Sequence, residues 1–138
     1  MPRRIFAVFM ITAALAAQTG ETYRARLSAV PADARTRPAL AGIGSATGTL
    51  SGSKLTVSGS FEGLLSPATT AQLHVAVAAG VRGPVIQDLT ISKATSGTLS
   101  GSADLNADEI EKLHKGGVYV QIQSEKEPEG VLWGWLLK

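Results

Sequence analysis

The residues that could do chemistry in this chain lie on two segments that alternate as β-strands do. His74 follows Gln72 by two positions in the first segment, and Gln121 and Gln123 have the same spacing within Val118–Ser124. Side chains two positions apart along a strand point to the same face. Each segment therefore presents a polar row, which could hold a metal, a partner or only water.

The two tryptophans, Trp133 and Trp135, form a third candidate site. They alternate with small and aliphatic residues in the predicted strand Val131–Leu137, so they share one face. Exposed paired aromatic side chains indicate a contact surface, because large apolar patches are rare on monomers. The alternative is that a loop such as Val30–Gly42, or the N-terminal strand, covers them, since alternation alone does not show which face is covered.

A catalytic arrangement is not expected. The chain has only two histidines, and none of its serines has a recognisable nucleophile context. Glu125, Glu127 and Glu129 could mimic a carboxylate pair, but three solvated charges around Pro128 explain them more simply. We therefore predict that the protein is not an enzyme, because no base and nucleophile can be assembled.

The elements that must position these residues are mostly strands. Period-two alternation dominates the chain, and breaks rich in glycine, serine and proline separate the alternating segments. Eight short strands with close turns are typical of an antiparallel sandwich or barrel, and we expect a β-sandwich of the immunoglobulin kind. The predicted strands cover residues 22–29, 44–51, 55–62, 72–77, 85–91, 97–104, 118–124 and 131–137.

One short helix is predicted at residues 106–115. Asn106 can cap the backbone N–H of Glu109, and Glu109 can reach back to complete a capping box. Gly116 supplies the left-handed residue that ends the helix. His114 lies near the negative end of the helix dipole, so we interpret it as an exposed helix-end residue without a functional role.

One hexapeptide, Gly-Thr-Leu-Ser-Gly-Ser, occurs twice, at Gly48–Ser53 and at Gly97–Ser102. Duplication of a half-sandwich is one interpretation. The flanking residues do not match, however. We therefore interpret the repeat as two hairpins with similar turn composition.

The N-terminus has the pattern of a signal peptide over residues 1–16. Arg3 and Arg4 precede an uncharged apolar run that ends in a small-x-small pattern, which predicts cleavage after Ala16 or Ala17. The apolar run is shorter than the roughly 20 residues of a membrane-spanning helix, although a retained anchor is the alternative. We expect an exported protein, periplasmic or secreted, with no membrane segment after cleavage.

The remaining residues, 17–138, suit a single domain of a size that can fold unaided. The chain has no cysteine, which favours a bacterial cell envelope over an animal extracellular space. It carries 13 basic and 11 acidic residues, and loss of Arg3 and Arg4 leaves 11 of each. No basic cluster remains that could follow a phosphate backbone, so we expect no nucleic-acid partner.

Several short motifs follow one another in a fixed order over nearly the whole mature chain. They are Leu27–Ala29, Ala46–Thr49, Phe61–Pro67, Thr70–His74 with Gly80–Val85, Leu113–Gln123 and Pro128–Gly134. This ordered set resembles the chordin-type (CHRD) domain family. The resemblance implies an all-β sandwich module, found in extracellular regulators of animals and in exported microbial proteins. It also implies a distant likeness to the copper/zinc superoxide dismutase sandwich.

Two positions depart from the family pattern where the resemblance implies histidines. Gln72 replaces the first histidine of the H-I-H motif, and Gln123 replaces the histidine of V-N-V-H-T. A zinc or copper site needs about three or four ligands, and glutamine is a poor one. We expect a hydrogen-bonded patch of Gln72, His74, Gln121 and Gln123, no cofactor and no metal, with His74 the one candidate ligand if a metal binds.

These observations predict an exported, non-catalytic module for protein interaction or structural binding in the cell envelope. Its partner would be an unidentified protein or a second copy of the chain. The contact would use Trp133 and Trp135, where the family pattern has an outward arginine and glutamine, or the Gln72 and His74 face. The alternative is a copper- or zinc-binding, dismutase-like protein whose histidine site is largely lost.

Overall fold

The computed structural model describes residues 20–31 and 40–138. The predicted signal peptide and most of the predicted loop Val30–Gly42 lie outside these residues. Within them, no helix is both long and apolar enough to cross a membrane. The elements are β1 (Glu21–Ala29), β2 (Ile43–Ser51), β3 (Lys54–Glu62), β4 (Ala68–Val75), β5 (Val85–Ile91), β6 (Gly97–Asp104), α2 (Ala107–His114), β7 (Val118–Ser124) and β8 (Leu132–Trp135).

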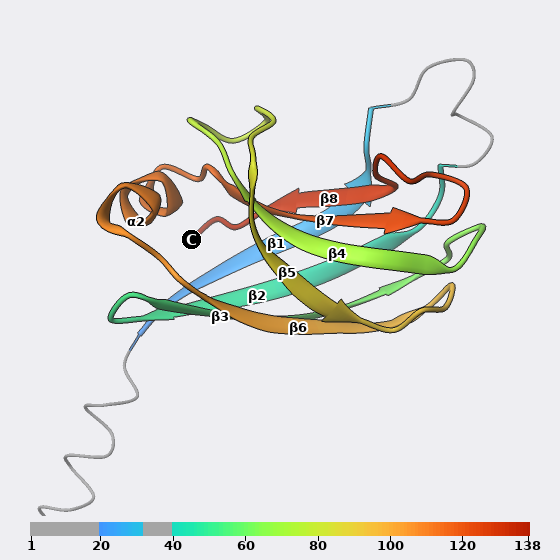
Figure 1. The fold of residues 1–138 in the computed structure, drawn as a ribbon, viewed down its shortest axis with the longest axis horizontal. Helices are drawn as coiled ribbons and strands as arrows, with labels where there is room; N and C mark the ends of the chain where they lie inside the picture. The colour runs from blue at the N-terminus through green and yellow to red at the C-terminus, as the bar shows by residue number, and fades with distance from the viewer. Residues whose placement is uncertain (1–19, 32–39) are drawn as a thin grey trace, which may run out of the picture.

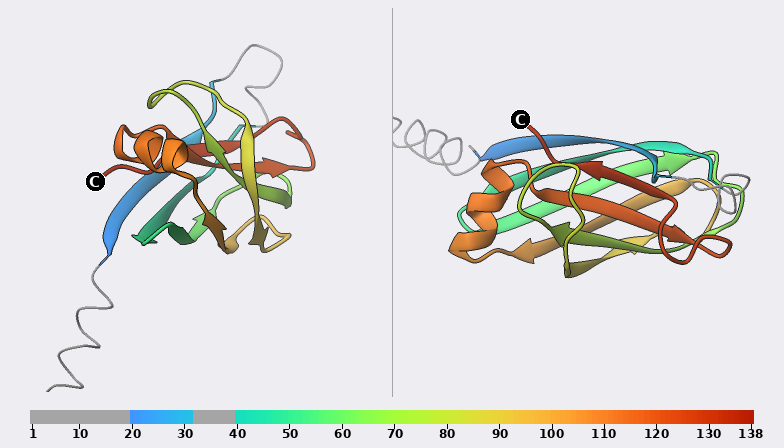
Figure 2. Two further views of the ribbon diagram at one scale, coloured as in Figure 1. Left: turned by 60° about the vertical axis from the view of Figure 1, so that its left-hand side comes forward. Right: turned by 90° about the horizontal axis from the view of Figure 1, so that it is seen from above.

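All eight strands pair antiparallel and close into one barrel in the order β1-β2-β3-β6-β5-β4-β7-β8 (Figure 1). The expected sandwich of two separate sheets is therefore wrong, although the all-β class and the number of strands are confirmed. Closure depends on two narrow contacts. The β5–β6 ladder holds only two residue pairs, and the β1–β8 ladder holds two pairs plus the isolated bridge Arg24↔Leu137. Figure 2 shows the strands surrounding a single interior.

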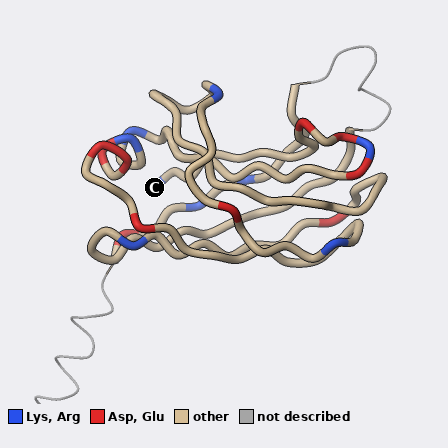
Figure 3. The backbone as a smooth tube through the Cα atoms, in the orientation of Figure 1, with Lys and Arg blue, Asp and Glu red and all other residues tan. Residues whose placement is uncertain are grey.

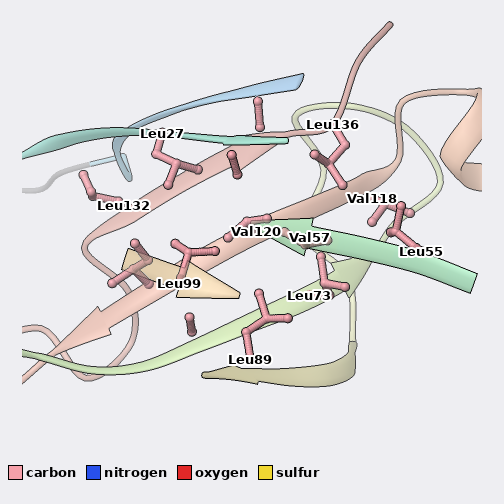
Figure 4. Packing of buried hydrophobic residues seen from close by; sticks show 14 of the residues in the cluster. Leu27, Leu55, Val57, Leu73, Leu89, Leu99, Val118, Val120, Leu132 and Leu136 are labelled. Carbon is pink, nitrogen blue, oxygen red and sulfur yellow. The ribbon is translucent and has the colours of Figure 1, made fainter. Parts of the chain in front are cut away.

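Charge and apolar side chains are separated in this barrel. Lysine, arginine, aspartate and glutamate gather mainly at the helix and in the connections at the two ends (Figure 3). The interior is filled from every strand by alternate side chains, including Leu27, Leu55, Leu73, Val120 and Leu136, each 0% exposed (Figure 4). Full burial of such a side chain stabilises a fold by about 1.5–3 kcal/mol, so a chain without disulfides can depend on this core.

The predicted helix is confirmed with its capping box. The Asn106 side chain accepts a hydrogen bond from the Glu109 N–H at 2.8 Å, and the Glu109 carboxylate accepts one from the Asn106 N–H at 2.9 Å. Gly116 follows the helix with a φ of 79°, in the left-handed region that glycine tolerates best. The helix closes one end of the barrel, where Leu113 is fully buried.

The repeated hexapeptide adopts two different structures. Its first copy ends β2 and forms the turn to β3, where Gly52 has a φ of 63°. Its second copy lies entirely within β6, so the expectation of two similar turns is wrong. Identical residues differ here because only the first copy is followed by a strand that pairs directly back on it.

Candidate functional site

The register of β4, β7 and β8 places the two predicted candidate surfaces on one continuous outer face. Gln72 pairs with Gln121, which pairs with Trp133 on its other side. In the next row of the same face, His74 pairs with Tyr119, and Tyr119 pairs with Trp135. We call His74, Tyr119, Gln121, Trp133 and Trp135 the aromatic face.

The rings of this face pack against one another around Tyr119. The His74 and Tyr119 rings are stacked, with centroids 4.7 Å apart and planes 14° from parallel. The Trp135 ring lies 4.1 Å from Tyr119 and the Trp133 ring lies 5.8 Å away in an edge-on arrangement. Such geometries add roughly 0.5–1.5 kcal/mol per pair beyond burial. The aromatic face is thus a packed layer on the outside of the barrel.

The connection between β4 and β5, residues 76–84, folds over this layer. Gly83 donates its backbone N–H to the Tyr119 hydroxyl oxygen at 3.1 Å. The Gly83 carbonyl accepts from the Tyr119 hydroxyl at 3.3 Å and lies 2.8 Å from His74 Nδ1. These contacts leave Tyr119 1% exposed although its side chain points outward from the sheet.

Arg82 extends this cover to the tryptophans. Its guanidinium lies 4.6 Å from the centre of the Trp133 ring, and its Nη1 lies 3.4 Å from Gln121 Oε1. Trp133 and Trp135 are consequently half-buried. Their outward placement is as predicted, but the cover in the described part of the chain is the β4–β5 connection. The N-terminal strand β1 pairs with β8, the strand that carries both tryptophans, and so lies next to them in the same sheet.

The predicted glutamine patch is not a mutual hydrogen-bond network. Gln72 Nε2 donates to Asp88 Oδ1 on β5 at 2.9 Å, and Gln121 Nε2 donates to the Glu129 carbonyl at 3.1 Å. Gln123 Oε1 is buried without a partner. Gln72 and Gln121 therefore bond to different neighbours, Asp88 on β5 and the turn before β8, and not to each other.

His74 does not fit a metal site of the copper or zinc kind. It is 8% exposed, its Nδ1 is occupied by Gly83, and only Nε2 is buried without a partner. In the described ranges, no three histidine, cysteine, aspartate or glutamate side chains lie close enough to share an ion. A stable site needs about three or four such ligands, and the neighbours of His74 across its two ladders are Tyr119 and Val85.

The second histidine, His114, is exposed at the end of α2, as predicted. Its Nε2 lies 2.9 Å from Glu21 Oε1 on β1, and Lys138 Nζ lies 3.2 Å from the other oxygen of the same carboxylate. The hydrogen bond from His114, followed by those from Tyr23 and Lys138, lowers the pKa of Glu21 to about 2. This cluster ties α2 to β1 and lies away from the aromatic face.

Exposed aliphatic side chains gather beside the aromatic face. Val77 and Val81 of the β4–β5 connection are 67% and 43% exposed, and Val85, which follows the connection, is 45% exposed. In Figure 1 the connection rises from the barrel above the labelled β4 and β5 strands. The predicted strand 72–77 extended to Val77, but β4 spans Ala68–Val75, and Val77 lies in the connection and is exposed to solvent.

Two residues central to this face were not singled out from the sequence. Tyr119 occupies an outward position in the same strand as Gln121 and Gln123, so its spacing was a usable signal. Arg82 had no such signal, because only the fold of the connection brings it 4.6 Å from a tryptophan fifty-one positions away. Structure and sequence together define the class of protein: an eight-stranded antiparallel barrel that carries the aromatic face on its outside.

Comparison with protein families identifies that class. The model of the CHRD domain matches residues 23–136. The chain therefore belongs to the CHRD-domain family, which confirms the resemblance inferred from its motifs. No curated protein and no solved structure matches the chain.

Proposed function

We propose that this protein is an exported, non-catalytic CHRD module that binds a protein partner, or a second copy of itself, in the cell envelope. The observation that carries the proposal is the exposure of Val77 and Val81, on a connection held against the aromatic face, and of Val85 at the start of β5. Export rests on the signal pattern of residues 1–16.

The chemistry of the surface suits protein recognition. Tryptophan, tyrosine and arginine dominate the energetics of protein interfaces, and Arg82, Trp133 and Trp135 lie together beside exposed valines. The contacts of Gly83 with His74 and Tyr119 restrain the connection before any partner arrives. A restrained loop loses less conformational entropy on binding than a free one.

A site-specific cross-linking experiment tests this proposal. A photo-reactive amino acid is placed at Val81 and, as the matched control, at Ser58 on the exposed side of β3. In intact cells, we expect a discrete cross-linked species from position 81 alone, and we expect V77D to reduce its yield. Equal labelling from both positions, or no discrete species from position 81, would contradict the proposal.

Sedimentation of the purified protein separates the two kinds of partner. Self-association that V77D weakens identifies a second copy of the chain as the partner. A strictly monomeric protein whose cross-linked species contains a different chain identifies a heterologous partner. A strictly monomeric protein with no cross-linked species from position 81 removes the contact-face function.

A further inference from the structure

A second surface lies on β1 and β2, next to the aromatic face but separate from the β4–β5 connection. It is a groove of about 800 Å³ on the outside of these two strands. A volume of this size exceeds what a single small ion occupies and falls in the range of sites for organic ligands. The outward side chains along it are Arg24, Arg26, Ser28, Ile43, Ser45 and Thr47.

The groove concentrates positive charge where the strands otherwise carry little. Strands β2, β4, β7 and β8 contain no lysine, arginine, aspartate or glutamate. Arg24 and Arg26 lie two positions apart on the exposed side of β1. No carboxylate in the described ranges lies within ion-pair distance of either guanidinium.

Hydroxyl groups and an aromatic ring border these arginines. Across β2, Thr47 pairs with Arg24 and Ser45 pairs with Arg26. On the other side, Ser28 pairs with Trp133 and Arg24 bridges to Leu137, a register that places Arg26 opposite Trp135. The groove therefore offers guanidinium and hydroxyl groups, and Trp135 lies beside it on β8.

We infer that this groove binds an acidic polysaccharide, a site beyond the protein contact proposed above. Arginine pairs with carboxylate or sulfate groups in a bidentate manner, and the serine and threonine hydroxyls can exchange hydrogen bonds with sugar hydroxyls. Trp135 and Ile43 supply apolar surface at either side for the faces of the sugar rings.

The lining favours a saccharide over an acidic peptide. A peptide commonly docks by extending an open sheet edge or by placing apolar side chains in pockets. Here β1 and β2 are both paired on each side within a closed barrel, so neither offers an edge. Among the described residues that line the groove, Ile43, 62% exposed, is the one large aliphatic side chain directed outward.

Calorimetric titration of the purified protein with two matched oligosaccharides tests the inference. The probes are an oligomer of galacturonic acid and a neutral galactose oligomer of equal length, with poly-glutamate as the acidic peptide. We expect the acidic saccharide to bind at least about tenfold more tightly than either other probe. Its affinity should fall as salt is added, because exposed charge pairs are screened.

Variants of the protein locate the binding. R24Q/R26Q should lose about tenfold in affinity for the acidic saccharide, whereas K54Q/K93Q, which removes two exposed charges elsewhere, should retain it. R24K/R26K keeps the charge but loses bidentate geometry and should fall between them. An unchanged circular dichroism spectrum and unfolding midpoint show that each variant is folded.

Several outcomes would overturn the inference. Equal binding of the neutral oligomer removes the role of charge, and equal loss in K54Q/K93Q removes the groove as the site. Tighter binding of poly-glutamate assigns the groove to an acidic protein instead. These results are independent of cross-linking from position 81, so failure here leaves the protein-contact proposal standing, and the reverse is also true.

Discussion

Tyr119 is the residue on which the outer face depends. Its ring separates His74 from the tryptophans, and its hydroxyl both accepts from and donates to the backbone of Gly83. The backbone N–H and carbonyl of Gly83 need hydrogen-bond partners, since an unsatisfied buried polar group lowers the stability of the fold by about 1–3 kcal/mol. One hydroxyl therefore fixes the connection that carries Arg82 and the exposed valines.

Removing that hydroxyl tests the arrangement. We expect Y119F to lower the free energy of unfolding by about 1–2 kcal/mol, because the ring packing stays while the Gly83 N–H loses its acceptor. Urea denaturation measures the change, and acrylamide quenching of Trp133 and Trp135 fluorescence should increase as the connection loosens. Unaltered stability and quenching would show that His74 alone holds Gly83.

At the scale of elements, α2 is attached to β1 through one carboxylate. The Glu21 carboxylate is hydrogen-bonded to His114 of the helix, to Tyr23 of its own strand and to Lys138 at the C-terminus. Burial, followed by the nearby Glu21, raises the pKa of Tyr23 to about 12, so the phenol stays protonated and can donate to the carboxylate. The capping box forms α2 locally, and this cluster fixes where the helix lies.

The lowered pKa of Glu21 predicts an acid-dependent part of the stability. Its ordinary value is 4.5 and its value in the folded protein is about 2, so the stabilisation is complete above pH 4.5 and is lost as the pH falls toward 2. The difference in unfolding free energy between the native protein and E21Q should therefore shrink over that interval. Because the cluster is exposed, we expect a small effect that salt reduces.

A second variant assigns the cause of that shift. His114 makes the largest contribution to the lowered pKa of Glu21. H114Q should therefore move the acid transition of Glu21 upward, as followed by NMR titration of its carboxyl carbon. A Glu21 titration that is the same in H114Q and the native protein would contradict this assignment.

At the scale of the whole molecule, the barrel is closed unevenly. The β2–β3 ladder contains nine residue pairs, whereas the β5–β6 ladder contains two. Residues 85–89 of β5 pair with β4, and only its last two residues, Thr90 and Ile91, pair with β6. The β1–β8 contact is also short, but the backbone of Arg24 and Leu137 reinforces it with two hydrogen bonds of 2.8 and 2.9 Å.

This unevenness predicts where the barrel opens first. Local opening occurs where few hydrogen bonds and contacts must break. In native-state hydrogen exchange, amides of the β5–β6 ladder, at Thr90, Ile91 and Ser100, should exchange at a lower opening free energy than those of Ala46 and Val57 in β2 and β3. Equal protection in all ladders would show that the barrel opens only by global unfolding.

Local patterns along the chain predicted most of the elements. Alternation predicted the bounds of β5, β6 and β7 as they are observed, because outward and inward positions in a half-buried strand need different polarity. The capping residues of α2 act within one helical turn, so the start of the helix could also be predicted from the sequence. The candidate residues of the outer face were found for the same reason, since their spacing is a property of single strands.

Tertiary structure decided how the barrel closes and which of the candidate site residues contact one another. Pairing of β5 with β6 and of β1 with β8 depends on how far each strand twists and bends, which no single segment encodes. The register between β4, β7 and β8 joined the glutamine row to the tryptophans, and the fold of the β4–β5 connection added Arg82. Sequence alone determined the family, through an ordered set of motifs, and most of the strands and outward residues, through local spacing. Which of those residues touch depends on contacts between distant segments, and only the folded barrel supplies them.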